Sequence, residues 1–355
     1  MKPRIQCFDV LKGIAILLVV MGHVITYGVY KIDSSLTFRI IGTVHMPLFF
    51  FISGYFTVRR RNGLLAVPNL RSRFMRLVVP MVIISSIWIL YYPHSGLPKH
   101  LTCTFAGLWS DQWKNGYWFT PVLFAIILLY SAAARLSNRM PRNSRTLQAL
   151  PFALLLAAVS VSEWLIPSNV SNCLSFSFIF TFIWVFLFGG FAALTGEKFI
   201  RFATSATGYT LSLAISVVLF IMLLYPDFIP FHSAPLVVLI ERMLLHCSLA
   251  VMTIGFCYPL TDGTPGASRS RGVRSWSLLG RKSLQIYLFH YFFLFPMASL
   301  RHLLQGMALD FVPVTAVALA ASLLIIACCL GVDALLSRSP LLSVLIGYPA
   351  ARNKK

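Results

Sequence analysis

Two histidines lie inside long apolar stretches of the sequence, where an ionisable side chain is costly unless it has a function. The helical rise from Lys12 to His23 is about 16 Å, and the rise from Arg59 back to His45 is about 21 Å. If these helices are antiparallel neighbours, both imidazoles reach similar depths in a membrane. Imidazole exchanges protons near neutral pH, so His23 and His45 are candidate catalytic bases. For each of them, a hydrogen bond between helices is the alternative interpretation.

Three more ionisable residues occur in later apolar stretches, namely Glu241, Arg242 and His290. Glu241 and Arg242 fit either a buried ion pair or a polar cavity that binds a hydroxylated acceptor. His290 lies nearer the basic end of its stretch, which favours a structural role over a role in binding substrate. All three are candidate substrate-binding residues.

A basic segment precedes the third apolar stretch and contains Arg71, Arg73 and Arg76. A guanidinium group can bond two phosphate oxygens at once, so this segment is a candidate site for a phosphorylated cytosolic donor. The alternative is that these arginines only keep the loop on the cytoplasmic side of a membrane.

Helices that cross a bilayer must position these side chains. The 355 residues are 58% hydrophobic and 11% charged, and apolar runs of about 20 residues recur along the chain. We therefore predict an all-α, polytopic membrane bundle. About ten transmembrane helices are expected, approximately over 10–30, 40–58, 74–92, 117–136, 147–166, 174–195, 208–225, 235–259, 280–300 and 311–333.

The positive charges predict the orientation of this bundle. Most of the 30 lysines and arginines fall in alternate loops, so both termini are expected on the cytoplasmic side. This topological use explains the net charge of +20 without nucleic acid as a partner. We expect one domain over 1–355, with a membrane core at about 8–333 and a cytoplasmic tail at 334–355.

Five motifs, in order along the chain, resemble those of the acyltransferase-3 family of membrane proteins, and especially its fucose 4-O-acetylase-like branch. They are FDVLKGIAILLVVMGHV (8–24), HMPLFFFISGYF (45–56), RSRFMRLVVP (71–80), YWFTPVLF (117–124) and LGRKSLQIYLFHY (279–291). They extend over most of the chain, and together they are far more specific than any one alone.

The resemblance implies roles for particular residues. His23 matches the essential first-helix histidine of the family, and the match also favours a catalytic role for His45. Asp9 and Lys12 match an acidic–basic pair, with lysine where many members have arginine. The resemblance assigns the binding of CoA to the basic residues Lys12, Arg71, Arg73 and Arg76.

Two other residues complete the set of candidates. Trp118 belongs to the fourth-helix motif and is a candidate substrate contact. Ser53, with Gly54, is small enough to let a neighbouring helix approach closely and is expected to support the structure.

The resemblance further implies an enzyme of the bacterial cytoplasmic (inner) membrane. It would transfer an acyl group, usually acetyl, from cytosolic acetyl-CoA to a hydroxyl of a sugar or envelope glycan. Direct transfer is favoured over a covalent acyl-enzyme, and no metal is expected. The main alternative is a transporter or flippase of a glycan-related solute, and a non-catalytic scaffold is a third possibility. The sequence leaves the acceptor, the size of the acyl group and homo-oligomerisation open.

Overall fold

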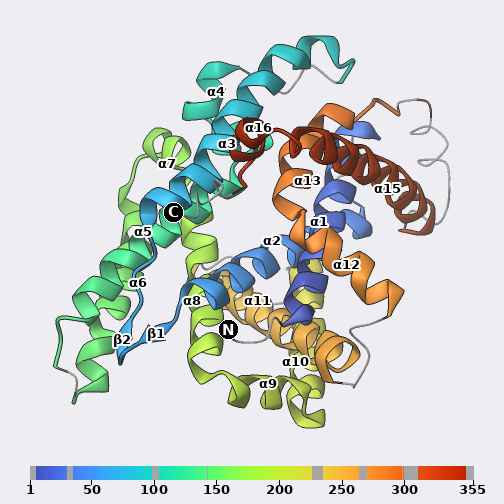
Figure 1. Cartoon of the computed structure of the whole chain (residues 1–355). Coiled ribbons are helices and arrows are strands. Elements are labelled where there is room, and N and C mark those ends of the chain that lie inside the picture. Colours follow the sequence, from blue (N-terminus) through green and yellow to red (C-terminus); the bar gives the residue numbers. More distant parts are fainter. Residues whose placement is uncertain are drawn as a thin grey trace.

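The computed structural model describes residues 5–29, 35–97, 104–141, 143–225, 235–263, 270–297, 299 and 311–348. Within these ranges the chain folds into helices and one short pair of strands (Figure 1). Nine helices of the described part are long and apolar enough to cross a membrane. The predicted all-α, multi-spanning class is therefore confirmed.

The elements have the following bounds. The long helices are α1 (Gln6–His23), α2 (Leu36–Thr57), α3 (Leu70–Tyr91), α5 (Phe119–Ser137), α6 (Arg145–Leu165), α8 (Phe176–Thr195), α10 (Ala206–Leu224), α11 (Pro235–Tyr258) and α15 (Phe311–Leu336). The shorter helices are α4 (Phe105–Ser110), α7 (Ser168–Leu174), α9 (Glu197–Thr204), α12 (Arg271–Arg281), α13 (Ser283–Phe289) and α16 (Pro340–Leu345). The π-helical turns are η1 (Val24–Gly28) and η5 (Pro259–Gly263), and the 3₁₀-helical turns are η2 (Tyr92–His94), η3 (Lys114–Gly116) and η7 (His290–Phe293). The strands are β1 (Arg60–Arg61) and β2 (Leu64–Leu65).

The stretch predicted as a span over 280–300 differs from the other nine, because it is not one continuous helix. Helix α12 ends at Arg281, α13 follows to Phe289, and η7 continues to Phe293. The break falls at Lys282, whose φ of −96° and ψ of 7° leave the helical region. The Lys282 ammonium turns toward Asp333, 2.7 Å away, which gives the charge a partner at the end of α15.

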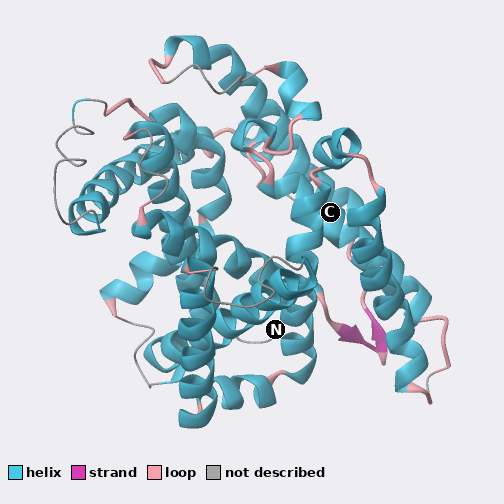
Figure 2. Cartoon of the chain, turned by 180° about the vertical axis from the view of Figure 1, so that it is seen from behind, coloured by secondary structure: helices cyan, strands magenta, loops and turns pink. Residues whose placement is uncertain are grey.

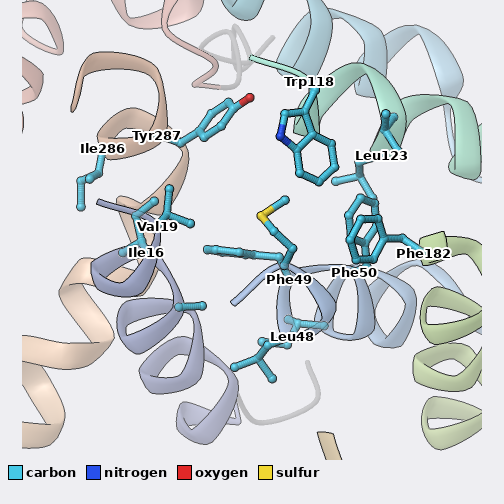
Figure 3. Packing of buried hydrophobic residues seen from close by; sticks show 14 of the residues in the cluster. Ile16, Val19, Leu48, Phe49, Phe50, Trp118, Leu123, Phe182, Ile286 and Tyr287 are labelled. Atoms are coloured by element: carbon cyan, nitrogen blue, oxygen red, sulfur yellow. The ribbon is translucent and has the colours of Figure 1, made fainter. Parts of the chain in front are cut away.

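The outermost helices carry the lipid-facing surface that a membrane protein needs. Leu154 of α6, Val218 of α10 and Leu324 of α15 are all more than half exposed. Helix α1 is enclosed instead, and its Ile16 and Val19 pack in the core near Phe49 and Tyr287 (Figure 3). The bundle therefore surrounds the helix that carries His23.

Glycines allow two pairs of helices to touch backbone to backbone. A Cβ at Gly280 of α12 would overlap the carbonyl oxygen of Asp9 in α1. Similarly, a Cβ at Gly54 of α2 would overlap the carbonyl oxygen of Phe186 in α8. Such close crossings stabilise bundles in lipid, where packing replaces the hydrophobic effect as the driving force. The expected close approach at Gly54 is present.

The carboxylate of Asp262, in the turn that follows α11, caps the first turn of α1. The backbone N–H groups of Gln6 and Cys7 donate to the two oxygens of Asp262, at 2.9 and 2.7 Å. These N–H groups have no partner within their own helix, and the negative charge also favours the helix N-terminus. Asp262 thus joins the end of α11 to the start of the helix that carries His23.

Replacing Asp262 with alanine is expected to destabilise the protein by about 1–2 kcal/mol, as the loss of other helix caps does. Thermal unfolding of the purified protein in detergent measures this as a lower transition midpoint. The exposed Asp111 provides a control, because Asp111→Ala removes a surface carboxylate from the outer loop. Equal midpoints for the two variants would contradict a capping role for Asp262.

A hairpin of β1 and β2 joins α2 to α3 at one end of the bundle (Figure 2), and its first strand consists of Arg60 and Arg61. Its turn, Asn62–Gly63, has positive φ at both residues, as a tight hairpin requires. The Asn138 side chain then bonds both the N–H and the C=O of Leu65, each at 2.9 Å. This clamp fixes the loop between Arg59 and α3 against the end of α5.

The end of the described chain folds back onto the bundle. The Tyr348 hydroxyl donates to Asp333 at 2.8 Å and lies 2.6 Å from the Lys282 ammonium, while Gln285 donates to the Ile346 carbonyl. Arg76 of α3 donates to the Gly347 carbonyl at 3.4 Å. The segment assigned to the tail therefore contacts the basic start of α3.

Candidate active site

His23 is the last residue of α1, at the point where the α-helix widens into the π-helix η1. Single π-helical turns are uncommon and frequently mark functional sites. The ring is half-buried and lies 5.5 Å from the ring of Tyr27. The helix therefore places a half-buried imidazole beside the Tyr27 ring at the start of the π-helical turn.

The two consecutive residues His290 and Tyr291 contact this imidazole. The Tyr291 hydroxyl lies 3.2 Å from His23 Nε2 and 3.4 Å from Nδ1. The His290 ring stacks on His23 with the centroids 5.0 Å apart. Both partners lie in η7, directly beyond the end of α13. The structure thus brings His23 together with a histidine and a tyrosine that lie more than 260 positions later in the sequence.

His290 is fully buried, and its hydrogen bonds define its tautomer. Its Nδ1 lies 2.7 Å from the carbonyl oxygen of Tyr287 and 3.2 Å from that of Ile286. A carbonyl can only accept, so Nδ1 carries the proton. Nε2 is then a bare nitrogen, and it has no hydrogen-bond partner among the described residues.

Aromatic side chains surround Tyr291. The rings of Trp88, Tyr117 and Tyr27 lie 5.6, 5.1 and 5.9 Å from the Tyr291 ring. Tyr291 itself is 1% exposed. Packing on several sides leaves the ring little freedom, so its hydroxyl has a fixed place beside His23.

His45 has a different environment from the other two histidines. Its Nδ1 is bonded to the carbonyl of Ile41, one turn earlier in α2, so Nδ1 carries the proton and Nε2 is bare. His45 is half-buried, and the helix α2 that carries it packs against α1. Its catalytic role stays a prediction, and the ring that stacks on His23 is that of His290.

Asp9 and Lys12 form an ion pair of 3.0 Å within the first turns of α1. The Lys12 ammonium also lies 5.8 Å from the ring centroid of Phe56, so α1 and α2 are in contact here. Asp9 is buried and stands at the close crossing with α12. Ser53 is half-buried in α2, next to the glycine that contacts α8.

The arginines of the basic segment occupy the first turns of α3. Arg71 and Arg76 are exposed, and Arg73 is half-buried near both Arg76 and Arg59. None of the three arginines 71, 73 and 76 forms an ion pair with a described residue. No carboxylate among the described residues therefore neutralises the repulsion between the positive charges of these arginines. The cluster is suited to bind a polyanion such as a nucleotide phosphate group.

The remaining candidates are distributed over the other helices. Trp118 is buried in an aromatic stack, with Phe178 at 4.1 Å and Phe182 at 5.7 Å. Figure 3 shows Trp118 above Phe50 and across from Tyr287. Glu241 is buried on α11, whereas its neighbour Arg242 is exposed, so the two side chains differ in environment.

Chemically, the cluster around His23 can hold an imidazole in one orientation and accept a proton from a hydroxyl group. Tyr291 is the contact that the sequence analysis did not single out. A signal was present, because Tyr291 ends the late motif LGRKSLQIYLFHY and directly follows His290. Only the folded chain shows that its hydroxyl reaches His23.

A family model described as an acyltransferase domain matches residues 5–328. The chain belongs to the acyltransferase-3 family. The match contains every residue of the cluster around His23 and the whole basic segment of α3. Within the acyltransferase-3 domain, the sequence resemblance and the folded arrangement therefore point to the same region.

Two curated relatives give a narrower comparison for this acyltransferase-3 chain. It is 30% identical over 182 residues to the nodulation protein NolL of Sinorhizobium fredii and 30% identical over 176 residues to NolL of Mesorhizobium japonicum. The alignments cover 48% of this chain and 48% and 47% of the two relatives. The chain thus spans about half the length of these relatives. No solved structure matches it.

Proposed function

We propose that this chain is a membrane O-acyltransferase of the bacterial cytoplasmic membrane. It moves an acyl group, acetyl in the simplest case, from cytosolic acyl-CoA to a hydroxyl of a sugar in an envelope glycan. The observation that carries the proposal is the oriented imidazole of His23 in the interior of an acyltransferase-3 domain.

His23 acts as the general base in this reaction. Its bare nitrogen takes the proton of the acceptor hydroxyl as the hydroxyl oxygen bonds to the thioester carbonyl carbon. The carbon–sulfur bond then breaks, and the leaving thiolate receives the proton from the imidazolium. No covalent acyl-enzyme is needed.

The donor enters from the cytoplasmic face, where Arg71, Arg73 and Arg76 hold its phosphates. The pantetheine arm of CoA reaches about 20 Å when extended. His23 lies about 16 Å along α1 from Lys12, so the thioester can reach the imidazole while the phosphates stay at the surface. Glu241, Arg242 and Trp118 are proposed as contacts for the acceptor.

Purified protein in liposomes tests the function. With isotopically labelled acetyl-CoA and envelope saccharides, we expect labelled acetyl ester on the saccharide, detected by mass spectrometry. Uptake of unmodified saccharide without any need for acetyl-CoA would identify a transporter and contradict the proposal.

Changing Arg71, Arg73 and Arg76 together to glutamine is expected to raise KM for acetyl-CoA by about 10–100-fold, because charge-assisted bonds to phosphate are lost. We expect kcat to change much less, because the basic segment does not contact His23. Steady-state kinetics in detergent measures both constants.

The matched control changes three exposed arginines on the same predicted face, Arg135, Arg139 and Arg145, to glutamine. This variant loses the same charge from α5, α6 and the loop between them instead of from α3. If both triple variants show the same KM, the donor site does not lie at the start of α3.

A further inference from the structure

We propose that Tyr291 is a positioning residue that sets the tautomer of His23, and that the turn 114–116 holds the Tyr291 hydroxyl in place. The inference rests on the proposed function, in which His23 is the general base. It adds a residue that acts through His23 and does not itself touch the reacting atoms.

The position of the hydroxyl suits this role. A neutral imidazole has one N–H group and one bare nitrogen, and only the bare nitrogen can accept a proton. Tyr291 Oη lies within 3.4 Å of both His23 nitrogens. The shorter of the two contacts is with Nε2, so we assign the N–H that Oη accepts to Nε2, which leaves Nδ1 bare for the acceptor. A second group that orients a catalytic histidine is a general feature of such sites.

Stacking restrains the ring from a second direction. His290 packs on His23 at 5.0 Å, with the ring planes 28° apart. His290 is itself fixed, because two backbone carbonyls hold its Nδ1. The His23 ring is thus held on one face by His290, while Tyr291 Oη accepts the proton of Nε2, the nearer nitrogen.

The turn at η3 explains why the hydroxyl stays there. Lys114, Asn115 and Gly116 have consecutive positive φ values of 49°, 54° and 93°. Two of these residues have side chains, for which this backbone conformation is unfavourable. At Gly116, a Cβ would overlap Tyr291 Oη, so glycine is needed both for its φ and for its lack of a side chain.

Lys114 supports this strained turn. Its ammonium is buried and donates to the carbonyls of Trp109, Asp111 and Cys173, at 3.2, 3.3 and 2.8 Å. Burial lowers the pKa of the Lys114 side chain from its ordinary value. These bonds connect the turn to the ends of α4 and α7, so the surrounding structure maintains the backbone strain beside Tyr291.

Tyr117 provides a matched control for Tyr291. It is fully buried, its ring is 5.1 Å from that of Tyr291, and its hydroxyl donates to the Leu288 carbonyl at 3.0 Å. Tyr117→Phe therefore removes a buried hydroxyl from the same aromatic cluster. The hydroxyl that it removes bonds the backbone of α13.

We expect Tyr291→Phe to lower kcat by about 10–100-fold, as loss of an orienting hydrogen bond does at other sites. KM for acetyl-CoA should stay within about twofold of wild type, because the basic segment is untouched. Tyr117→Phe should keep kcat within about threefold of wild type. Equal losses of kcat in the two variants would mean that both tyrosines act only through packing, and would overturn the inference.

A spectroscopic measurement separates this inference from the proposed function. The measurement is ¹⁵N NMR of protein labelled with ¹⁵N-histidine, in which the His23 ring signals are assigned by their loss in His23→Gln. The wild-type spectrum should show one protonated and one bare nitrogen for His23. Tyr291→Phe should shift both signals toward averaged values, and unchanged signals would overturn the tautomer role. If the His23 variants keep full activity, the proposed function fails whatever the spectra show.

Discussion

Replacing His23 with alanine is expected to lower kcat for acyl transfer by about 10²–10⁴-fold, the contribution typical of a positioned general base. The acceptor hydroxyl then has no group to take its proton as it attacks the thioester. KM for acetyl-CoA should change little, since the arginines of α3 hold the phosphates. Transfer of labelled acetyl by the purified protein measures both constants.

The control for this variant is His94→Ala, which removes an exposed imidazole at η2. It should keep wild-type kcat. Size-exclusion profiles and thermal midpoints show that both variants are folded. Wild-type transfer by folded His23→Ala would remove His23 from the mechanism.

Changing Gly280 to alanine is expected to destabilise the protein by about 1–3 kcal/mol or more. The added Cβ overlaps the carbonyl oxygen of Asp9, and backbone cannot rotate away as a side chain can. Helices α1 and α12 must then separate, which also moves His290 and Tyr291 relative to His23. Thermal unfolding in detergent and acyl-transfer assays should therefore both show losses.

Two other helical glycines serve as controls for Gly280. At Gly42 of α2 and Gly331 of α15, an added Cβ meets nothing within 4 Å. Alanine there should leave stability unchanged or raise it by about 0.5–1 kcal/mol, because glycine disfavours helices. If Gly280→Ala behaves like these two variants, the close crossing of α1 and α12 is not important for stability.

The sequence predicted most of the spans because membrane helices follow a local rule. Long apolar runs located nine continuous helices, and the small residue Gly54 correctly indicated a close helix contact. The broken stretch after Arg281 was not predicted. An average of hydropathy over a window hides a break at one residue, and Lys282 leaves the helix for a partner on α15.

The site was predictable only in part. His23 was identified because an imidazole deep in an apolar run is conspicuous, whereas Tyr291 was marked only by its place at the end of the late motif. The contact between them depends on the π-helical turn after His23 and on the positive φ at Gly116. Both depend on long-range packing. The cap by Asp262 was missed for the same reason, since the two ends of that bond are 256 positions apart.

In the proposed mechanism, the acyl end of a cytosolic thioester reaches His23 inside the bundle. A CoA thioether that carries a photoreactive diazirine in place of the acyl group tests it directly, with crosslinked peptides mapped by mass spectrometry. We predict adducts in the peptides that contain His23 and Tyr291, and their loss when acetyl-CoA is added in excess. Adducts confined to exposed residues at the cytoplasmic surface, or adducts that acetyl-CoA does not displace, would contradict the account.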